Sequence, residues 1–416
     1  MADSASQPTT PDVATTPQAL TMGTGEFVVM IAGLMALNAL AIDVMLPALD
    51  EIAADLGVAA ANDQQLVIYA YIAGFGVPQL VWGPLTDRYG RRSIVFMALA
   101  GYALTGLACM FAPSFSMLLA MRFAQGVFAS ACRVVAVSIV RDIFAGRGMA
   151  RIMSLVMTIF MVVPILAPSI GQAILFFAPW GWTFGVLTIT ALIIAVWAWF
   201  RLPETLPEDR RRPFNPSQTV RNYIEVFSDP VTLGYMLASG VIFGSLFAFI
   251  GSSEQVMTEV FGLGDSFVLW FAGVAGVLSI SNFTNSRLVE KFGMRRMSQS
   301  ALVAFIALGI VLITLMNTIG PVFAVFFPLF ALMFGCFGMI GSNFNAMAME
   351  SQGQIAGTAS AAYGFFTTTM SSFIGWMIGS QYDGTVTPLL TGFVVLGITC
   401  MVIVGIVEKG KFFQCR

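Results

Sequence analysis

The sequence has no histidine and little charge. Of its 416 residues, 57% are hydrophobic and only 10% are charged, whereas soluble domains carry about 25% charged residues. The missing charge excludes a soluble globular protein, and the missing histidine removes the side chain that most often exchanges protons near neutral pH. Any proton carrier in this chain would therefore have to be a carboxylate.

Cysteine is also scarce, and its spacing fits neither a disulfide framework nor a metal site. Most of the cysteines fall in apolar segments, and the full set is Cys109, Cys132, Cys336, Cys400 and Cys415. The sequence has no nucleophile constellation and no nucleotide-binding loop. It therefore predicts no metal, no cofactor and no enzyme active site.

Long apolar runs are abundant instead. Runs of roughly 20 mainly apolar residues, the length that crosses a bilayer, occur twelve times, at 25–47, 64–84, 93–112, 114–136, 152–177, 180–201, 231–252, 267–287, 298–317, 322–345, 354–380 and 386–407. The runs lack the alternation of barrel strands, and backbone groups in lipid need internal hydrogen bonds, so we expect helices. The predicted fold class is an all-α polytopic membrane protein with twelve transmembrane helices.

The basic residues are distributed unevenly. Apart from Arg122 and Arg133, all of the 20 Lys and Arg residues fall in or beside the segments after the second, fourth, sixth and eighth runs, or in the C-terminal tail. The alternate segments carry acids and no basic residue. Because Lys and Arg accumulate on the cytoplasmic side, we expect both termini in the cytoplasm.

Two short segments repeat each other. "LTDRYGRR" at 85–92 and "LVEKFGMRR" at 288–296 share Leu, an acid, a base, an aromatic residue and Gly at an offset of 203 residues. Each follows the second run of its own half of the chain. A duplicated unit of six helices is typical of transporters, so we expect two pseudo-symmetric halves, residues 25–201 and 231–407.

The remaining segments are polar. Residues 1–24 are expected to form a disordered cytoplasmic tail, residues 202–230 a cytoplasmic linker and residues 408–416 a C-terminal tail. In the linker, four apolar residues follow helical spacing, namely Val220, Tyr223, Ile224 and Phe227. This pattern fits either a short amphipathic helix on the membrane surface or an ordinary linker.

The segment "GPLTDRYGRR" at 83–92 is a candidate conformational switch. We expect Gly83 and Pro84 to break the second helix and Gly90 to permit a tight turn. Asp87 is placed to accept hydrogen bonds from backbone amides or arginines. The segment is either a latch between the halves or a plain basic turn, and its candidate residues are Gly83, Asp87, Arg88, Gly90, Arg91 and Arg92.

The fifth run contains two prolines four residues apart. Pro164 and Pro168 each remove a backbone donor, which predicts a kink or loosened turn. Gly171, with Ala167 one turn before it, offers a small-residue face for close helix approach. The expected role is a hinge or a packing seam between the halves; the alternative is a kink without mechanistic use.

Asp43, Arg122 and Arg133 are the charges predicted inside the membrane. A charged side chain at the bilayer centre is costly, so such residues usually face a cavity and mark an ion or proton pathway. At about 1.5 Å per residue, Asp43 lies about 27 Å from the cytoplasmic end of its helix, Arg122 about 28 Å and Arg133 about 12 Å. Arg122 is therefore the expected partner of Asp43.

Arg133 is expected on the same side of the fourth helix as Arg122. There it would form an inner positive site, suited to an anionic substrate or to the exclusion of cations. The alternative is that its guanidinium reaches back to the inner membrane surface.

These motifs resemble the major facilitator superfamily, and within it the drug/proton antiporters of the bicyclomycin- and chloramphenicol-resistance type. The resemblance covers nearly the whole chain and is carried by "IDVMLP" at 42–47, the 83–92 segment, "RFAQG" at 122–126, "RLPET" at 201–205 and "AGTASA" at 356–361. One motif departs from the family: its Gly-Pro-x-x-Gly-Gly in the fifth helix reads "APSIGQ" here, at 167–172.

The resemblance implies export of phenicol- or bicyclomycin-like amphiphiles in exchange for protons. Asp43 would be the proton-responsive group, paired with Arg122 in a way that changes during alternating access. The candidate substrate cavity is lined by Arg133, Gln125, Phe243, Phe247, Tyr363 and Phe366, although aromatic residues in membrane helices often face lipid instead. The expected partners are a small-molecule drug, protons and the bilayer, with no nucleic acid and no second subunit; a metabolite or siderophore exporter is the alternative.

Overall fold

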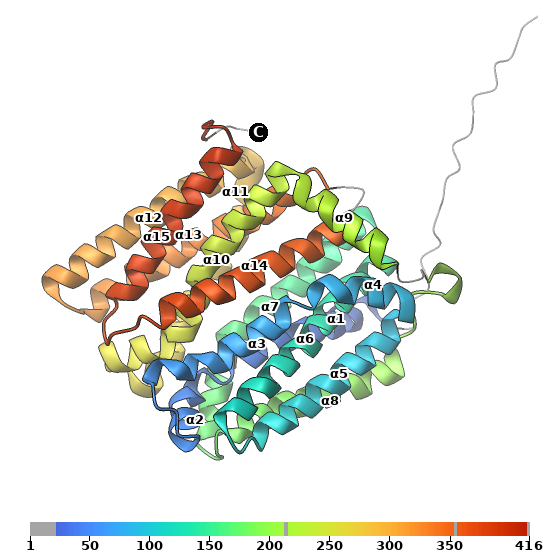
Figure 1. The fold of residues 1–416 in the computed structure, drawn as a ribbon, viewed down its shortest axis with the longest axis horizontal. Coiled ribbons are helices and arrows are strands. Elements are labelled where there is room, and N and C mark those ends of the chain that lie inside the picture. The colour runs from blue at the N-terminus through green and yellow to red at the C-terminus, as the bar shows by residue number, and fades with distance from the viewer. Residues whose placement is uncertain (1–21, 212–214, 353–355, 414–416) are drawn as a thin grey trace, which may run out of the picture.

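The computed structural model describes residues 22–211, 215–352 and 356–413. All regular elements in these ranges are helices, which confirms the predicted fold class (Figure 1). Residues 1–21 of the predicted N-terminal tail lie outside the described ranges. So do Cys415 and the end of the predicted C-terminal tail.

The chain forms fifteen α-helices in the described ranges. In order, they are α1 (Thr24–Asp43), α2 (Leu49–Asp55), α3 (Leu66–Gly76), α4 (Gln79–Tyr89), α5 (Arg91–Met110), α6 (Phe115–Ile143), α7 (Gly146–Leu175), α8 (Gly181–Arg201), α9 (Pro216–Ser228), α10 (Pro230–Gln255), α11 (Phe267–Phe292), α12 (Met294–Ile319), α13 (Phe323–Met349), α14 (Ala356–Gly379) and α15 (Thr387–Val407).

Most of these helices can cross a membrane. Of the described residues, ten helices are long and apolar enough, or eleven if the bent pair α3 and α4 is one span. The 24-residue helix α14 contains many Gly, Ser and Thr residues and is less apolar, yet it packs within the bundle beside α10 and α3. With α14 included, the helices account for the twelve apolar runs of the sequence.

The first and second sets of helices lie side by side as two halves, with α9 across one end (Figure 1). The sequence repeat has a matching geometry. Gly90 and Gly293 each stand alone between two helices, with φ of 87° and 79°, a region that favours glycine. The backbone N–H of Gly90 bonds to Thr86 O and that of Gly293 to Val289 O. The two copies of the repeat therefore form the same kind of glycine turn between two helices.

The second transmembrane span bends at a different proline from the one predicted. The sequence places the break at Gly83 and Pro84, but α4 continues through Pro84 and the 47° bend falls between α3 and α4, at Pro78. Pro84 removes the donor that would bond to Leu80 O. The hydroxyl of Tyr223 in α9 donates to that carbonyl at 2.8 Å, so the missing bond is replaced from outside the helix.

The linker forms the amphipathic helix α9. Asn215 caps it by accepting from Gln218 N, and Pro216 occupies its first position, where no backbone donor is needed. Tyr223 and Phe227 turn toward the bundle, while Val220 and Ile224 are exposed. The ring of Phe227 lies 5.5 Å from that of Phe366 in α14. Because Tyr223 holds α4 and Phe227 holds α14, α9 contacts both halves.

The halves meet at the end of the bundle that carries Asp50, Asp63 and Glu254, which we call the acidic face. Here the amide of Gln65 donates to Gln255 Oε1 at 2.6 Å across the two halves. The amide of Asn62 donates to the carbonyls that follow α14, and Gln172 donates to Asp265 at 3.1 Å. The opposite end, with residues 83–92 and the linker, is the basic face.

Candidate functional site

A cavity of about 1500 Å³ lies between the halves and extends to the linker at the basic face. Its walls come from α1, α3, α4 and α6 of the first half and from α10, α11, α13 and α14 of the second. Side chains at the acidic face close the other end. Among the described residues, the cavity therefore opens at the basic face and is closed at the acidic face.

Four of the six predicted cavity residues line this space, namely Arg133, Phe243, Phe247 and Tyr363. The prediction was wrong for the other two. Gln125 is fully buried beside Arg122, from which its Oε1 accepts a hydrogen bond. Phe366 turns away from the cavity and packs on Phe227 of the linker helix.

Asp43 is the last residue of α1, where the α-helix gives way to a bend and the short 3₁₀ turn Leu46–Ala48. Its side chain is 4% exposed. Within the described part of the chain it forms no ion pair and accepts no hydrogen bond. An isolated buried charge is very costly, so this environment favours the protonated, neutral carboxyl group.

Arg122 is fully buried and does not pair with Asp43 in this conformation, unlike the predicted arrangement. Its Nη2 donates to Ala41 O at 2.9 Å, its Nε to Val67 O at 3.1 Å and its Nη1 to Gln125 at 2.7 Å. Its guanidinium also lies over the ring of Tyr71 at 4.3 Å. Main-chain carbonyls, that of Ala41 in the last turn of α1 and that of Val67 in the first turn of α3, thus take the place of the carboxylate.

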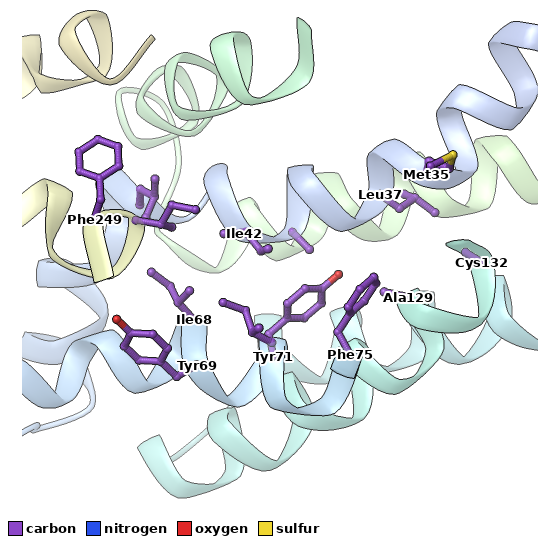
Figure 2. Close-up of a cluster of buried hydrophobic side chains, with 14 of the residues drawn as sticks. Met35, Leu37, Ile42, Ile68, Tyr69, Tyr71, Phe75, Ala129, Cys132 and Phe249 are labelled. Carbon is purple, nitrogen blue, oxygen red and sulfur yellow. The ribbon is translucent and has the colours of Figure 1, made fainter. Parts of the chain in front are cut away.

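Aromatic side chains of α3 fill the space around this arginine. Tyr71 and Phe75 point from α3 into the gap between α1, near Ile42, and α6, near Ala129 (Figure 2). The hydroxyl of Tyr71 donates to Asn38 of α1 at 3.1 Å. These rings separate the Arg122 site from the cavity, which Phe75 itself lines.

The 83–92 segment forms a charged network at the basic face. Arg91 bonds to Asp87 at 2.6 Å and to Asp142, at the end of α6, at 2.8 Å. Glu204 accepts from the backbone amides of Arg91 and Arg92. Asp87, Arg91 and Asp142 belong to the first half and Glu204 to the start of the linker, so among the described residues this network does not include a group of the second half in this conformation.

The other predicted switch residues support this network. Gly83 lines the cavity and Gly90 makes the turn between α4 and α5. Arg92 donates to Trp199 O at 2.8 Å, and Arg88 lies over the ring of Tyr89. The side chains of Asp87 and Arg91 also line the cavity mouth.

The two prolines of α7 do not interrupt it, since α7 is one α-helix from Gly146 to Leu175. Gly171 explains why its C-terminal half is close to α1. A Cβ atom added at Gly171 would lie 1.9 Å from the carbonyl oxygen of Val44, the residue after Asp43. The same end of α7 packs against α11 of the other half. Gly171 thus lets α7 touch the bend that follows Asp43.

Sequence reasoning missed the residues that close the acidic face and anchor Arg91. The residues that close the acidic face are polar and lie at the ends of apolar runs, namely Gln65, Gln255 and Asn62. This position was the only sign in the sequence of their role. Asp142 stands directly after Arg141 in the sequence, and Glu204 lies inside the "RLPET" motif. Their partners are distant in the chain, so local spacing does not reveal them.

Comparisons with known proteins agree with this architecture. Residues 31–380 match the family model described as Major Facilitator Superfamily. The chain is 33% identical to the "Uncharacterized MFS-type transporter YdgK" of Bacillus subtilis over 84% of this chain and 87% of that protein. It is 32% identical to the "Bicyclomycin resistance protein homolog" of Haemophilus influenzae, over 88% of this chain and 91% of that one.

A more distant relative and a solved structure extend the comparison. The "Multidrug resistance protein MdtL" of Escherichia coli O157:H7 is 29% identical over 72% of this chain and 74% of its own length. The partially occluded inward-open xylose transporter XylE of E. coli superposes with a TM-score of 0.72 at 11% identity, covering 93% of this chain and 99% of that one. At that identity the likeness concerns the fold alone. Together with the matched family model, these findings establish that the chain belongs to the Major Facilitator Superfamily of membrane transporters.

Proposed function

We propose that this chain exports small amphiphilic drugs, such as phenicols or bicyclomycin-like compounds, in exchange for protons. The observation that carries the proposal is the buried, unpaired carboxyl group of Asp43, next to a cavity that opens at the basic face. Relatives named for bicyclomycin and multidrug resistance support drugs as the substrate class. Export of an endogenous metabolite or siderophore is the second candidate, since the cavity lining is compatible with either.

The charge distribution supports an orientation in a bacterial inner membrane. Basic residues gather at the end of the bundle onto which the cavity opens, and such residues are typical of the cytoplasmic side. The described conformation would then face the cytoplasm, with both termini on that side. The protein would act as a monomer with its substrate, protons and lipid as partners, because one chain encloses the whole cavity.

In this mechanism Asp43 carries a proton in the cytoplasm-facing conformation. Burial without a partner favours the neutral group, whereas access to water would allow it to ionise. Asp43 lies at the bend that ends α1, and Gly171 of α7 touches the next residue, Val44. Movement of α1 against α7 would thus change the environment of the carboxyl group and link protonation to alternating access.

The test replaces Asp43 with Asn and compares it with Asp63→Asn, an exposed acid at the acidic face. Everted membrane vesicles that express each variant are energised with a proton gradient and supplied with chloramphenicol. We expect gradient-driven uptake to be lost in Asp43→Asn and retained in Asp63→Asn at equal protein levels. Undiminished proton-driven uptake by Asp43→Asn would refute the role of Asp43.

A further inference from the structure

Arg133 is a cation without a partner in the wall of the cavity. It projects from α6, lines the cavity and forms neither a salt bridge nor a hydrogen bond with the described residues. Its guanidinium lies 5.8 Å from the ring centroid of Phe75. An arginine has five N–H donors, so this group faces the cavity with its donors available.

The rest of the cavity lining does not compensate this charge. Among the described residues that line the cavity, the one carboxylate is Asp87, and it already bonds to Arg91 at 2.6 Å. Arg141 and Arg210 add further positive charge near the mouth. Arg133 stands eight residues before Arg141 on the same helix, which places it about 12 Å deeper. The interior of the cavity is therefore positive.

The cavity that contains Arg133 is also lined by aromatic rings, and this combination of a charge and apolar groups suits an amphiphile. Phe243 and Phe247 line the cavity from α10, and Phe75 lines it from α3. Tyr363 of α14 also lines it, and its hydroxyl donates to Ser239 at 2.9 Å. A molecule with an aromatic body and a charged end could place its body against these rings and its charge at Arg133.

We propose that the exported substrate carries an acidic group, a carboxylate, sulfonate or phosphate, which the guanidinium of Arg133 binds. This inference rests on the proposed export function and extends it: phenicols and bicyclomycin are uncharged, and acidic amphiphiles would be the preferred members of the substrate class. A guanidinium matches such oxyanions in shape and can bond to two oxygens at once. The positive interior would at the same time exclude organic cations.

The direction of export agrees with this charge. If one proton enters while one monoanion leaves, two elementary charges move with an inside-negative membrane potential. The exchange of one proton for one monovalent cation moves no net charge. An anionic substrate thus allows the potential to contribute to export in addition to the pH gradient.

The test measures binding to the purified full chain in nanodiscs by quenching of its tryptophan fluorescence. The probes are 1-naphthoate and chloramphenicol hemisuccinate, each paired with its uncharged methyl ester. The variants are Arg133→Gln, Arg133→Lys and, as a control that removes an exposed arginine outside the cavity lining, Arg287→Gln in α11. All four proteins are compared at one pH and one ionic strength.

In the unmodified protein we expect each acid to bind about tenfold more tightly than its ester or better, as a charge-assisted bidentate contact implies. Arg133→Gln should remove this preference and leave ester binding unchanged. Arg133→Lys should keep part of it, and Arg287→Gln should keep nearly all of it. Equal affinity for acid and ester in the unmodified protein, or a preference that survives Arg133→Gln, would overturn the inference.

This measurement separates the inference from the proposed function. Binding in nanodiscs requires neither a proton gradient nor transport. A protein that exports uncharged drugs with no preference for acids would refute the Arg133 inference alone. A protein that prefers acids but shows no proton-driven transport would refute the proposed function alone.

Discussion

Arg122 donates a hydrogen bond to the main-chain oxygen of Ala41 at 2.9 Å, two residues before Asp43, and leaves the carboxyl group of Asp43 unpaired. The same guanidinium bonds to Val67 of α3. Arg122 therefore joins α1, α3 and α6 at the depth of Asp43. This arrangement makes Arg122 a brace in the described conformation.

If Arg122 is a brace, the shape of its guanidinium matters for stability in addition to its positive charge. Arg122→Lys keeps the positive charge but cannot reach three acceptors in different directions. The carbonyl of Ala41, in the last turn of α1, would lose its donor, and a buried unsatisfied group costs about 1–3 kcal/mol. We expect a lower midpoint of thermal unfolding in detergent. An unchanged midpoint would contradict the role of Arg122 as a brace.

Gly171 predicts a steric effect at the bend that follows Asp43. In Gly171→Val the Cβ would lie 1.9 Å from the oxygen of Val44, so α1 and α7 would have to separate. Overpacking of this kind costs about 1–3 kcal/mol or more. We expect loss of proton-driven transport together with reduced thermal stability.

The matched control for this prediction is Gly276→Val in α11. A Cβ added at Gly276 would meet no atom within 4 Å, and the position is also within a membrane-spanning helix. We expect this variant to keep transport and stability close to those of the unmodified protein. Equal damage at both positions would mean that a general intolerance of valine, and not the contact with Val44, causes the effect.

Sequence patterns were sufficient for the helices and the repeat, because these depend on local composition. Hydropathy marks each run, and the duplicated acid-base-aromatic-Gly pattern locates Gly90 and Gly293, which have the same backbone geometry. The rise per residue along straight helices likewise predicts that Arg122 lies at the same depth in the membrane as Asp43. Each of these inferences needs only residues that are close in the chain.

The sequence was insufficient where a partner is distant. The sequence pattern predicts a break of the second span at Gly83 and Pro84, and the structure bends at Pro78 instead. The hydroxyl that replaces the lost bond of Pro84 comes from Tyr223, 143 residues away from Leu80 in the chain. In the same way, carbonyls exist at every residue, so the sequence could not indicate that Arg122 would bond to Ala41 and not to Asp43.

The contact between Tyr223 and Leu80 yields a further prediction. Tyr223→Phe removes the hydroxyl that donates to Leu80 O and leaves the ring in place. The carbonyl of Leu80, which Pro84 cannot pair, would then lack a donor. The helix α9 would lose one of its contacts with α4. We expect faster proteolysis of the linker, measured by limited trypsin digestion at its arginines, with helix content of the bundle unchanged.

The pH dependence of this contact has a defined sign. Burial raises the pKa of Tyr223 from its ordinary value of 10.0 to about 12. The folded protein therefore holds this proton more tightly than the unfolded chain does. The stabilising contact is fully present below pH 10 and is lost as the pH rises through 12. The difference in proteolysis between the unmodified protein and Tyr223→Phe should thus be constant from pH 7 to about 9; a difference that disappears within that range would contradict this assignment.

The acidic face should control the balance between the two access states. Gln255→Ala removes the amide pair that joins the halves at 2.6 Å. The loss of one such hydrogen bond is worth about 0.5–1.5 kcal/mol, or about a two- to tenfold change in an equilibrium. We expect the conformation that opens the acidic face to become more populated by this factor.

This population can be measured with spin labels at Glu51 and Gln381. Both residues are exposed at the acidic face, one in each half. Double electron–electron resonance in nanodiscs would report the fraction of molecules with a long separation between the labels. The fraction should increase in Gln255→Ala; if it does not, the amide pair does not hold the two halves together.

Glu254 predicts a change of opposite sign with the same labels. Its side chain is 6% exposed, it contacts Asp50 of the other half, and its Oε2 has no donor among the described residues. At about pH 9, where both groups are ionised, the two carboxylates only accept hydrogen bonds, and the acidic face carries no Lys or Arg to separate them. Glu254→Gln supplies an amide donor to Asp50 and removes one negative charge at nearly constant volume. We therefore expect the halves to be held together more tightly, with a smaller fraction of long label separations and slower turnover. An increased fraction in this variant would show that the contact between Glu254 and Asp50 stabilises the closed acidic face as it stands.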